Sequence, residues 1–203
     1  MDDKLPTVIS FYTNNWEYPA YANKLMKSCE RLDVGAYIVE VEDTGSWIGN
    51  TKRKPQFILD QLTNLKRPVL WIDVDGSLYK RPTLLQEPFE YDIALRPRPG
   101  GHARKWHVGT MYFSYNERAI KFIEQWIYYT EKAGKDGSDD RALEDMWKGD
   151  KLTFDDLRVF ELPATYFQML NSNHPTPLLP TVIAHRASEG DSKKRYMKRM
   201  RNA

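Results

Sequence analysis

Short apolar runs alternate with stretches of helical periodicity along the first third of this chain. Residues 7–12, 36–41 and 68–72 are rich in β-branched and aromatic side chains, as is typical of strands. The run at 68–72 is apolar throughout, which predicts a strand buried on both faces. Between the first two strands, apolar residues recur at helical spacing over residues 18–32. This order predicts a parallel, right-handed strand–helix–strand unit.

The rest of the chain continues this alternation. Residues 44–50 are expected to form a loop, and Pro55 suits the first turn of a helix, where proline is favoured. Further strands are expected at residues 91–95, 106–114, 158–163 and 181–184, and further helices at residues 119–130 and 139–147. The pattern therefore predicts one α/β domain, with no internal repeat and no linker long enough to divide it.

The composition is that of a folded protein. Of the 203 residues, 41% are hydrophobic and 13% aromatic, which is too apolar for a disordered chain. No apolar run approaches the length of a membrane span. The acidic start of the chain is followed by no long apolar segment, so we expect no secretory signal. The single cysteine, Cys29, permits no intrachain disulfide and fits a reducing, cytoplasmic compartment.

Two carboxylates follow the apolar run at residues 68–72. Asp73 and Asp75 are one residue apart, and alternate residues of a strand share a face, so both are expected to reach a common point beyond the strand. Open α/β sheets bind ligands at this edge, and a hard divalent cation would relieve the repulsion between the carboxylates. The alternative, that Asp73 caps a turn and Asp75 begins one with Gly76, is equally well supported by this stretch alone.

The absence of two common phosphate-binding motifs narrows the possible fold classes. The chain has no Gly-x-Gly-x-x-Gly and no Gly-Lys-Ser/Thr, which argues against an ordinary dinucleotide fold and a P-loop. Lys54 precedes a predicted helix, where it is either an anion-binding group or a surface lysine. The net charge of +2 is unevenly distributed, because basic residues gather at 96–105 and 193–201. These are either solvated segments or surfaces for phosphate.

Five segments combine into a more specific signal. They are residues 11–15 with Tyr18, Lys54 before Pro55, residues 71–75, residues 107–113, and residues 162–167 with 182–185. In this order they resemble the metal-dependent glycosyltransferases of the GT-A fold, and most closely the glycogenin-like group that uses nucleotide-diphospho-sugar donors. The resemblance covers most of the chain. It implies a single GT-A (Rossmann-like) domain over residues 1–203, with a mixed, mostly parallel central sheet flanked by helices and a basic tail from about residue 190.

The resemblance also implies roles for individual residues. The metal, Mn²⁺ or Mg²⁺, would be held by Asp73, Asp75 and His185. The donor-binding residues would be Tyr12, Thr13, Asn14, Tyr18, Lys54, Asp73, Gly109, Lys193 and Lys194. Asp139 and Asp140 are the candidates for a catalytic carboxylate, which would stabilise the positive charge of the reacting sugar. Without this context, a residue such as His185 is more often a hydrogen-bonded structural histidine, and residues such as Asp139 and Asp140 more often cap a helix.

This chain departs from the family pattern at two places. The family has Asp-Gln near residue 139 and an asparagine at position 107, whereas this chain has two consecutive aspartates followed by Arg141, and His107. The first departure leaves the retaining or inverting outcome open. The second leaves the identity of the sugar open.

The partner expected from the resemblance is a nucleotide-sugar donor, most simply a uridine diphosphate sugar. We expect no membrane partner. The acceptor is either a hydroxylated DNA base or a glycan, small molecule or protein. Acceptor-binding candidates lie around the basic loop: Arg96, Arg98, His102, Arg104, Lys105 and His107. A non-catalytic nucleic-acid-binding protein on the same scaffold is a second class. A metal-dependent phosphotransferase is a third, which would normally show more carboxylates and a phosphate-cradling loop.

Overall fold

The computed structural model describes residues 4–98, 100, 105–134, 137–149, 156–171, 176–177 and 180–186. The predicted basic tail lies outside these residues, so the extent of the domain stays a prediction. None of the helices in the described part of the chain combines the length and the apolar character that crossing a membrane requires.

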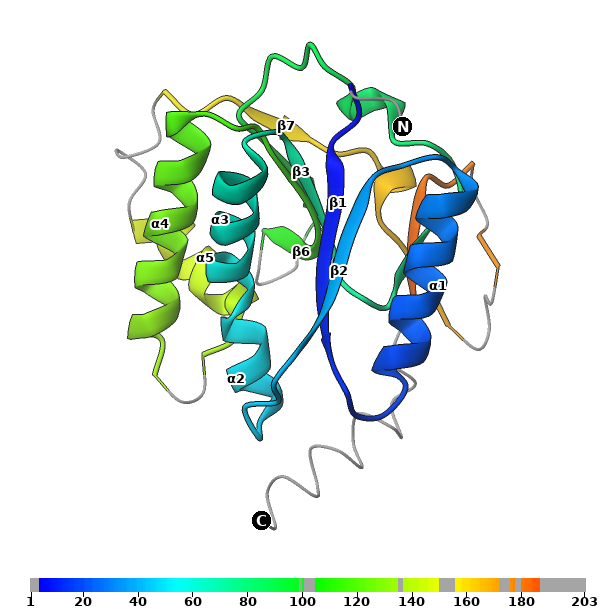
Figure 1. Cartoon of the computed structure of the whole chain (residues 1–203). Helices are drawn as coiled ribbons and strands as arrows, with labels where there is room; N and C mark the ends of the chain where they lie inside the picture. Colours follow the sequence, from blue (N-terminus) through cyan, green and yellow to red (C-terminus); the bar gives the residue numbers. More distant parts are fainter. Residues whose placement is uncertain are drawn as a thin grey trace.

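A mixed six-stranded sheet forms the centre of the molecule (Figure 1). Its strands, in spatial order, are β2 (Ala36–Val41), β1 (Thr7–Thr13), β3 (Val69–Ile72), β6 (Trp106–Phe113), β5 (Ile93–Pro97) and β7 (Val159–Glu161). β1 pairs in parallel with both β2 and β3, and β5 pairs in parallel with β7. β6 is antiparallel to both of its neighbours. The predicted parallel start and the mostly parallel central sheet are confirmed.

A second, three-stranded sheet has the order β4 (Gly76–Leu78), β9 (Ile183–Arg186) and β8 (Gln168–Leu170). β9 is antiparallel to β4 and parallel to β8. The sequence predicted a late strand near β9, but it did not predict β4 or β8. Strands of three residues are too short to show an alternating pattern.

Helices cover both faces of the central sheet. They are α1 (Tyr18–Arg31), α2 (Trp47–Lys52), α3 (Lys54–Leu65), α4 (Glu117–Lys132) and α5 (Asp139–Gly149), with 3-10 turns at Thr83–Leu85 and Ala164–Tyr166. α3, α4 and α5 lie on one side of the sheet in Figure 1, and α1 lies on the other side with the second sheet. This is the α/β arrangement that the sequence predicted.

The strand β3 shows how one segment serves both layers. Val69 and Trp71 join the core beneath α3, α4 and α5, whereas Leu70 and Ile72 join the core beneath α1 and the second sheet. All four side chains are buried, as predicted. Successive residues of a strand point to opposite faces, so an unbroken apolar run is needed where both faces are covered.

Local signals explain several helix ends. α3 begins at Lys54 with Pro55 in its first turn, as predicted. Asn116 caps α4 by accepting a hydrogen bond from the Ala119 amide. The expectation of a loop over residues 44–50 is wrong in part, because α2 begins at Trp47. The Ser46 hydroxyl accepts a bond from the Gly49 amide, which starts this short helix.

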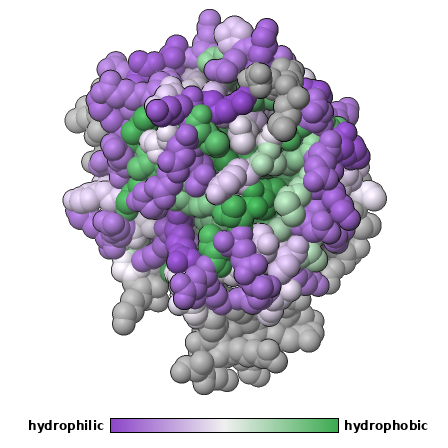
Figure 2. Space-filling model, in the orientation of Figure 1, coloured by the Kyte–Doolittle hydropathy of each residue, from purple (hydrophilic) through white to green (hydrophobic). Residues whose placement is uncertain are grey.

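β2 forms one edge of the central sheet, and most of its residues are exposed or half-buried. Figure 2, in the orientation of Figure 1, shows apolar residues near the centre of this face and hydrophilic residues around them. β3 and β6, in the middle of the sheet, are more deeply enclosed, so the centre of the fold lies there. The carboxyl end of β3 is the place at which the candidate residues gather.

Candidate active site

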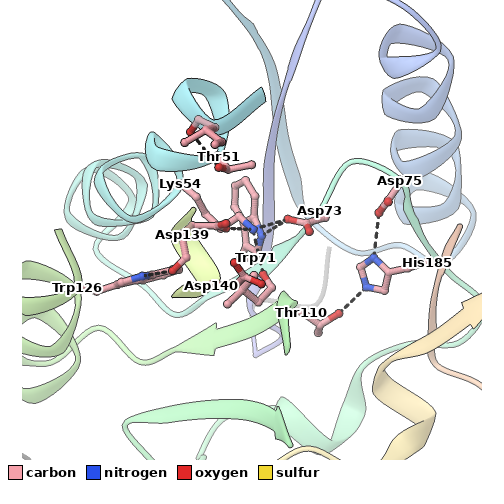
Figure 3. A network of polar contacts seen from close by, with 12 residues as sticks. Thr51, Lys54, Trp71, Asp73, Asp75, Thr110, Trp126, Asp139, Asp140 and His185 are labelled. Atoms are coloured by element: carbon pink, nitrogen blue, oxygen red, sulfur yellow. Dashed lines mark hydrogen bonds and ion pairs between the residues drawn. The ribbon is translucent and has the colours of Figure 1, made fainter. Parts of the chain in front are cut away.

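The two aspartates of the metal motif lie just after β3, in a turn. β3 ends at Ile72, and the Gly76 amide donates to the Asp73 carbonyl over 2.7 Å. The Asp73 amide donates to the Gly109 carbonyl over 2.8 Å, which attaches the turn to β6. The expectation that both aspartates share one face of a strand is therefore wrong. Their side chains leave the turn in different directions (Figure 3).

Lys54 forms the first cluster of the site. Its ammonium lies 2.8 Å from Asp73 Oδ1 and 2.6 Å from Asp139 Oδ2, and it donates to the Val108 carbonyl over 3.3 Å. Lys54 is the first residue of α3 and Asp139 the first of α5, so two helix starts face the end of β3. The Lys54 and Asp139 side chains are only 5% and 4% exposed. Both are thus shielded from water, whereas Asp73 is partly open.

Burial and charge act against each other in this cluster. Burial lowers the pKa of Lys54, but the nearby charges of Asp139 and Asp73 outweigh it and raise the pKa above its ordinary value. Burial also raises the pKa of Asp139, and the Lys54 ammonium only partly offsets that effect. Lys54 is therefore charged at neutral pH and shared between two carboxyl groups. Lys54, at the start of α3, thus links Asp139 of α5 to Asp73 in the turn after β3.

A hydrogen bond from Trp71 fixes the orientation of the Asp73 carboxylate. Its indole nitrogen donates a hydrogen bond of 2.8 Å to Asp73 Oδ1, the oxygen that also faces Lys54. The Trp71 ring is almost fully buried between Phe11 and Phe57. No residue in the described part of the chain forms a hydrogen bond or ion pair with Asp73 Oδ2. One oxygen of Asp73 is thus occupied, and the other is open to a ligand.

Asp75 and His185 form the second cluster. His185 Nδ1 lies 3.1 Å from Asp75 Oδ1, and its Nε2 lies 2.8 Å from the Thr110 hydroxyl. The pairing of β4 with β9 brings them together, since Gly76 lies opposite His185 in the register. The His185 side chain is 2% exposed and that of Asp75 30%. The carboxylate is therefore the accessible member of the pair.

Gly109 separates the two clusters. A Cβ at this position would lie 2.8 Å from the Phe167 ring, 3.3 Å from Asp73 Oδ2 and 3.4 Å from His185 Cε1. Asp73 and His185 thus both come close to Gly109 of β6. Glycine is needed here because any side chain would collide with these groups, and a ligand contact at Gly109 stays a prediction.

The donor set tests whether a divalent ion fits. Across the described residues, no group of three or more His, Cys, Asp or Glu side chains is arranged to hold a metal. The Asp75 and His185 atoms are nevertheless 3.1 Å apart, and adjacent ligands of an octahedral ion with bonds of about 2.1 Å are separated by about 3 Å. Asp73 Oδ2 faces the same strand. The Asp75 and His185 pair is therefore spaced as two ligands of one ion would be, and a third ligand from Asp73 stays a prediction.

Asp140 points away from Lys54. Its carboxylate lies 3.5 Å from Arg98 Nη2 and accepts a bond from the Ser138 hydroxyl. Arg98 also donates to the Trp106 carbonyl over 2.8 Å, so the hairpin between β5 and β6 supports Asp140. The two consecutive aspartates therefore differ in environment: Asp139 is buried against a lysine, and Asp140 lies nearer the surface against an arginine.

The predicted nucleoside-binding residues lie at the carboxyl end of β1. Tyr12 is half-buried, Thr13 is buried, Asn14 is exposed, and Tyr18 begins α1 with its ring stacked on Trp16. They share this edge of the sheet with the two clusters, but none is bonded to them.

Sequence reasoning did not identify one polar network at this edge. The Thr13 hydroxyl donates to Asn15 Oδ1 over 2.9 Å, and Asn15 Nδ2 donates to Asp43 Oδ2 over 2.6 Å. Asp43 also accepts from Asn50 of α2 over 2.7 Å. Its place just after the parallel strand β2 is the signal that could have revealed it. Trp71, Thr110 and Phe167 were also not assigned to the site, because apolar and small residues carry no chemical signature.

The predicted acceptor-binding residues are dispersed. Arg96 donates to the Leu162 carbonyl, and Lys105 lies over the rings of Trp106 and Trp147. His107 stacks on Phe167 and so belongs to the neighbourhood of His185. The acceptor candidates His102 and Arg104 lie outside the described residues, and so do the predicted donor-binding residues Lys193 and Lys194.

Comparison with known structures finds a similar fold in glycosyltransferases. A glycosyltransferase involved in the glycosylation of the major capsid of PBCV-1 matches with a TM-score of 0.63 and 12% identity, over 98% of this chain and 100% of its own. The chain has a glycosyltransferase fold. Two structures of the glycosyltransferase GlyE of Streptococcus pneumoniae TIGR4 match with TM-scores of 0.63 and 0.64 at 17% identity. No family model and no curated protein sequence matches the chain.

The similarity to these structures concerns the fold. This chain spans 60% of the length of GlyE, and 96–97% of this chain is matched. Identities of 12–17% show the fold alone.

Proposed function

We propose that this protein is a metal-dependent glycosyltransferase that moves a sugar from a nucleoside-diphosphate donor, a uridine diphosphate sugar, to an acceptor hydroxyl. The convergence of Asp73 and His185 on Gly109, at the carboxyl end of β3, carries the proposal. This edge of an α/β sheet is where ligands bind. Open carboxylate oxygens, an imidazole and a close backbone approach are the groups that a diphosphate with its counter-ion requires.

Asp75, His185 and Asp73 would hold the ion. Carboxylate and imidazole ligands suit Mn²⁺, and carboxylates alone also suit Mg²⁺. When bound, the ion would supply charge neutralisation for the departing diphosphate. Thr110 fixes one edge of the His185 ring, and Trp71 fixes one oxygen of Asp73. The ligands are therefore aimed by neighbours, as in metal sites generally.

Lys54 and Asp139 would form the polar floor of the sugar site. Their charges are paired with each other and with Asp73, and they lie under the strand that carries Gly109. Asp140 is the better candidate for the carboxylate that stabilises the positive sugar, because it is less buried and its arginine partner is 3.5 Å away. An ionised carboxylate close to the anomeric carbon lowers the energy of such a transition state.

The nucleoside would lie over the end of β1. Tyr12 or Tyr18 would stack on the base, and the network of Thr13, Asn15 and Asp43 offers the polar groups for its edge. Lys193 and Lys194, outside the described residues, would reach the phosphates. The exposed carboxylate of Asp43 is suited to accept an N–H donor of a base.

The acceptor is proposed to be a glycan or a protein. The PBCV-1 glycosyltransferase takes part in the glycosylation of a capsid, which supports this class. A hydroxylated DNA base is the alternative. Arg96 and Arg98 donate to the Leu162 and Trp106 carbonyls, and Arg98 is paired with Asp140, so part of their donors and charge is not available to a DNA backbone. Duplex binding that weakens steeply with salt would favour DNA.

Donor hydrolysis and transfer, measured with a panel of nucleotide sugars, test the proposal. Activity should require Mn²⁺ or Mg²⁺ and disappear in excess chelator. Asp75→Asn should abolish it, whereas Asp60→Asn, an identical change on the exposed face of α3, should not. A thermal-shift screen with and without Mn²⁺ identifies the donor, because a ligand that binds the native state raises its melting temperature. Full turnover in excess chelator would contradict the metal-dependent mechanism.

A further inference from the structure

Three aromatic rings are stacked beside the candidate metal pair. The Phe167 ring lies 4.1 Å from the His107 ring at an interplanar angle of 25°, and 4.5 Å from the His185 ring at 28°. The three residues come from different elements: His107 from β6, Phe167 from the segment before β8, and His185 from β9. Phe167 is thus enclosed between two imidazoles, and neither of its faces is available to a ligand.

The edge of the His185 ring is already held by two hydrogen bonds. Nδ1 faces Asp75 and Nε2 faces Thr110. Cε1 lies close to Gly76 and Gly109, where an added Cβ would come within 3.0 and 3.4 Å of it. Hydrogen bonds to ring nitrogens act near the plane of the ring, so they restrain in-plane displacement more than tilting. A group against the face of the imidazole is needed to fix its plane.

The position of Phe167 is itself rigid. Its ring lies 2.8 Å from the Cβ position of Gly109, and its amide donates to the Ala164 carbonyl over 3.2 Å. The neighbouring Tyr166 is buried and its hydroxyl accepts a bond of 3.2 Å from the Leu84 amide. The Val182 amide donates to the Thr165 carbonyl over 2.7 Å, which joins this turn to β9. Phe167 and His185 are therefore held by one connected unit.

We propose that Phe167 is a positioning residue that fixes the plane of the His185 imidazole, so that Nδ1 stays aimed at the ion beside Asp75. This inference rests on the proposed metal-dependent function. Groups that orient a metal-binding histidine are usually hydrogen-bond partners, and their loss typically lowers metal affinity by about 10- to 100-fold. In this protein, hydrogen bonds hold the edge of the His185 ring, and the stacked Phe167 ring holds its plane. The stacking contact thus orients the histidine as a hydrogen-bond partner would.

Phe167→Leu tests the inference with two readouts. The ring protons of His185 should lose the upfield shift that a stacked aromatic ring causes, and the affinity for Mn²⁺ should fall by about 10-fold or more. The turnover at saturating Mn²⁺ should stay close to that of the wild type, because only binding is affected. Phe167→Tyr keeps the ring and should restore both readouts. Phe160→Leu is the control, since this half-buried ring contacts Phe89 and Tyr91 instead.

The outcomes separate this inference from the function on which it rests. Unchanged His185 shifts or unchanged Mn²⁺ affinity in Phe167→Leu overturn the positioning role. Equal losses in Phe160→Leu also overturn it, because they would show a general effect of removing a ring. If the wild-type chain binds no Mn²⁺, the proposed function fails, and the His185 shifts alone then decide whether Phe167 holds the imidazole.

Discussion

The indole nitrogen of Trp71 donates a hydrogen bond of 2.8 Å to the carboxylate of Asp73 at the end of β3. Trp71 belongs to β3 and Asp73 to the turn that follows it, so the bond joins the strand to the turn. The bond explains why a large aromatic residue stands in a strand otherwise composed of aliphatic side chains. It also orients the oxygen of Asp73 that remains open.

Trp71→Phe removes this bond and keeps an aromatic ring against Phe11 and Phe57. We expect a loss of about 1 kcal/mol in the free energy of unfolding, since Asp73 is partly exposed and water replaces part of the bond. Activity should fall more than stability, because Asp73 loses its fixed orientation. Urea titration and donor hydrolysis provide the two measurements. In a double-mutant cycle with Asp73→Asn, additive effects would show that the two side chains act independently.

Lys54→Met should be strongly destabilising. It leaves Asp139 buried without its cation, and breaking a buried ion pair in this way costs about 3–5 kcal/mol. Replacing Asp139 by leucine in the same chain should recover much of the loss, because no uncompensated charge remains. The control is Lys121→Met, which breaks an exposed pair with Glu117 and should change the free energy of unfolding little, because water screens such pairs. Similar losses for Lys54→Met and Lys121→Met contradict the prediction.

Asp92 should make the stability of the fold depend on acid. It is fully buried and bonds to Arg118, Arg158 and Asn116. Burial tends to raise its pKa, but the hydrogen bonds from both arginines lower the pKa well below its ordinary value. The unfolded chain therefore binds a proton more readily than the folded chain. The stabilisation is fully present above the ordinary carboxyl pKa of about 4 and is lost as pH falls below it.

Unfolding of the wild type and of Asp92→Asn, followed from pH 7 down to about pH 2, provides the measurement. The variant should be less stable at pH 7, and the difference between the two proteins should shrink as pH decreases. A constant difference across this range would mean that the Asp92 charge contributes nothing. Asp156→Asn, a change at an exposed residue, is the control.

Asp140→Asn should lower turnover sharply and change donor affinity little. The contact with the positive sugar is made mostly in the transition state, so kcat falls while KM is nearly preserved. Asp145→Asn, an exposed position on the same helix, should match the wild type in both. Equal losses of donor affinity and stability in Asp140→Asn would instead support a helix-capping role.

Gly109→Ala should disturb the site with a single methyl group. The new atom would lie 2.8 Å from Phe167 and would press on Asp73 and His185. Overpacking of this kind costs about 1–3 kcal/mol, and we expect activity to be lost. Gly100→Ala is the matched control, because nothing lies within 4 Å of its Cβ position. Wild-type activity in Gly109→Ala would show that the strand can move aside.

The fold was predicted best where the signal is local. Each successful signal lies within the segment that it predicts: the apolar run of β3, the periodicity of α1 and α4, and Pro55 at the start of α3. Lys54 at a helix start and the two aspartates opening α5 were predicted in the same way. The short strands β4 and β8 were missed, because each is defined by its pairing with β9, a separate segment of the chain.

The site was predicted as a set of residues and not as an arrangement. Nothing in the sequence near Asp73 shows that it turns towards Lys54 while Asp75 turns towards His185. That division arises because β3 stops at Ile72 and the chain then forms a turn, which the pattern of alternating residues did not reveal. The pairing of Lys54 with Asp139 likewise depends on how two helices pack, and no single segment encodes it.

The place of β9 in the second sheet has a consequence for synthesis of the protein on the ribosome. All six strands of the central sheet come before residue 162, whereas His185 belongs to the last described strand and lies between β4 and β8. A nascent chain can pair its central strands while Asp75 still lacks its histidine. Its candidate metal pair is completed only when β9 inserts, so binding competence arises late, as a separate event from collapse of the main core.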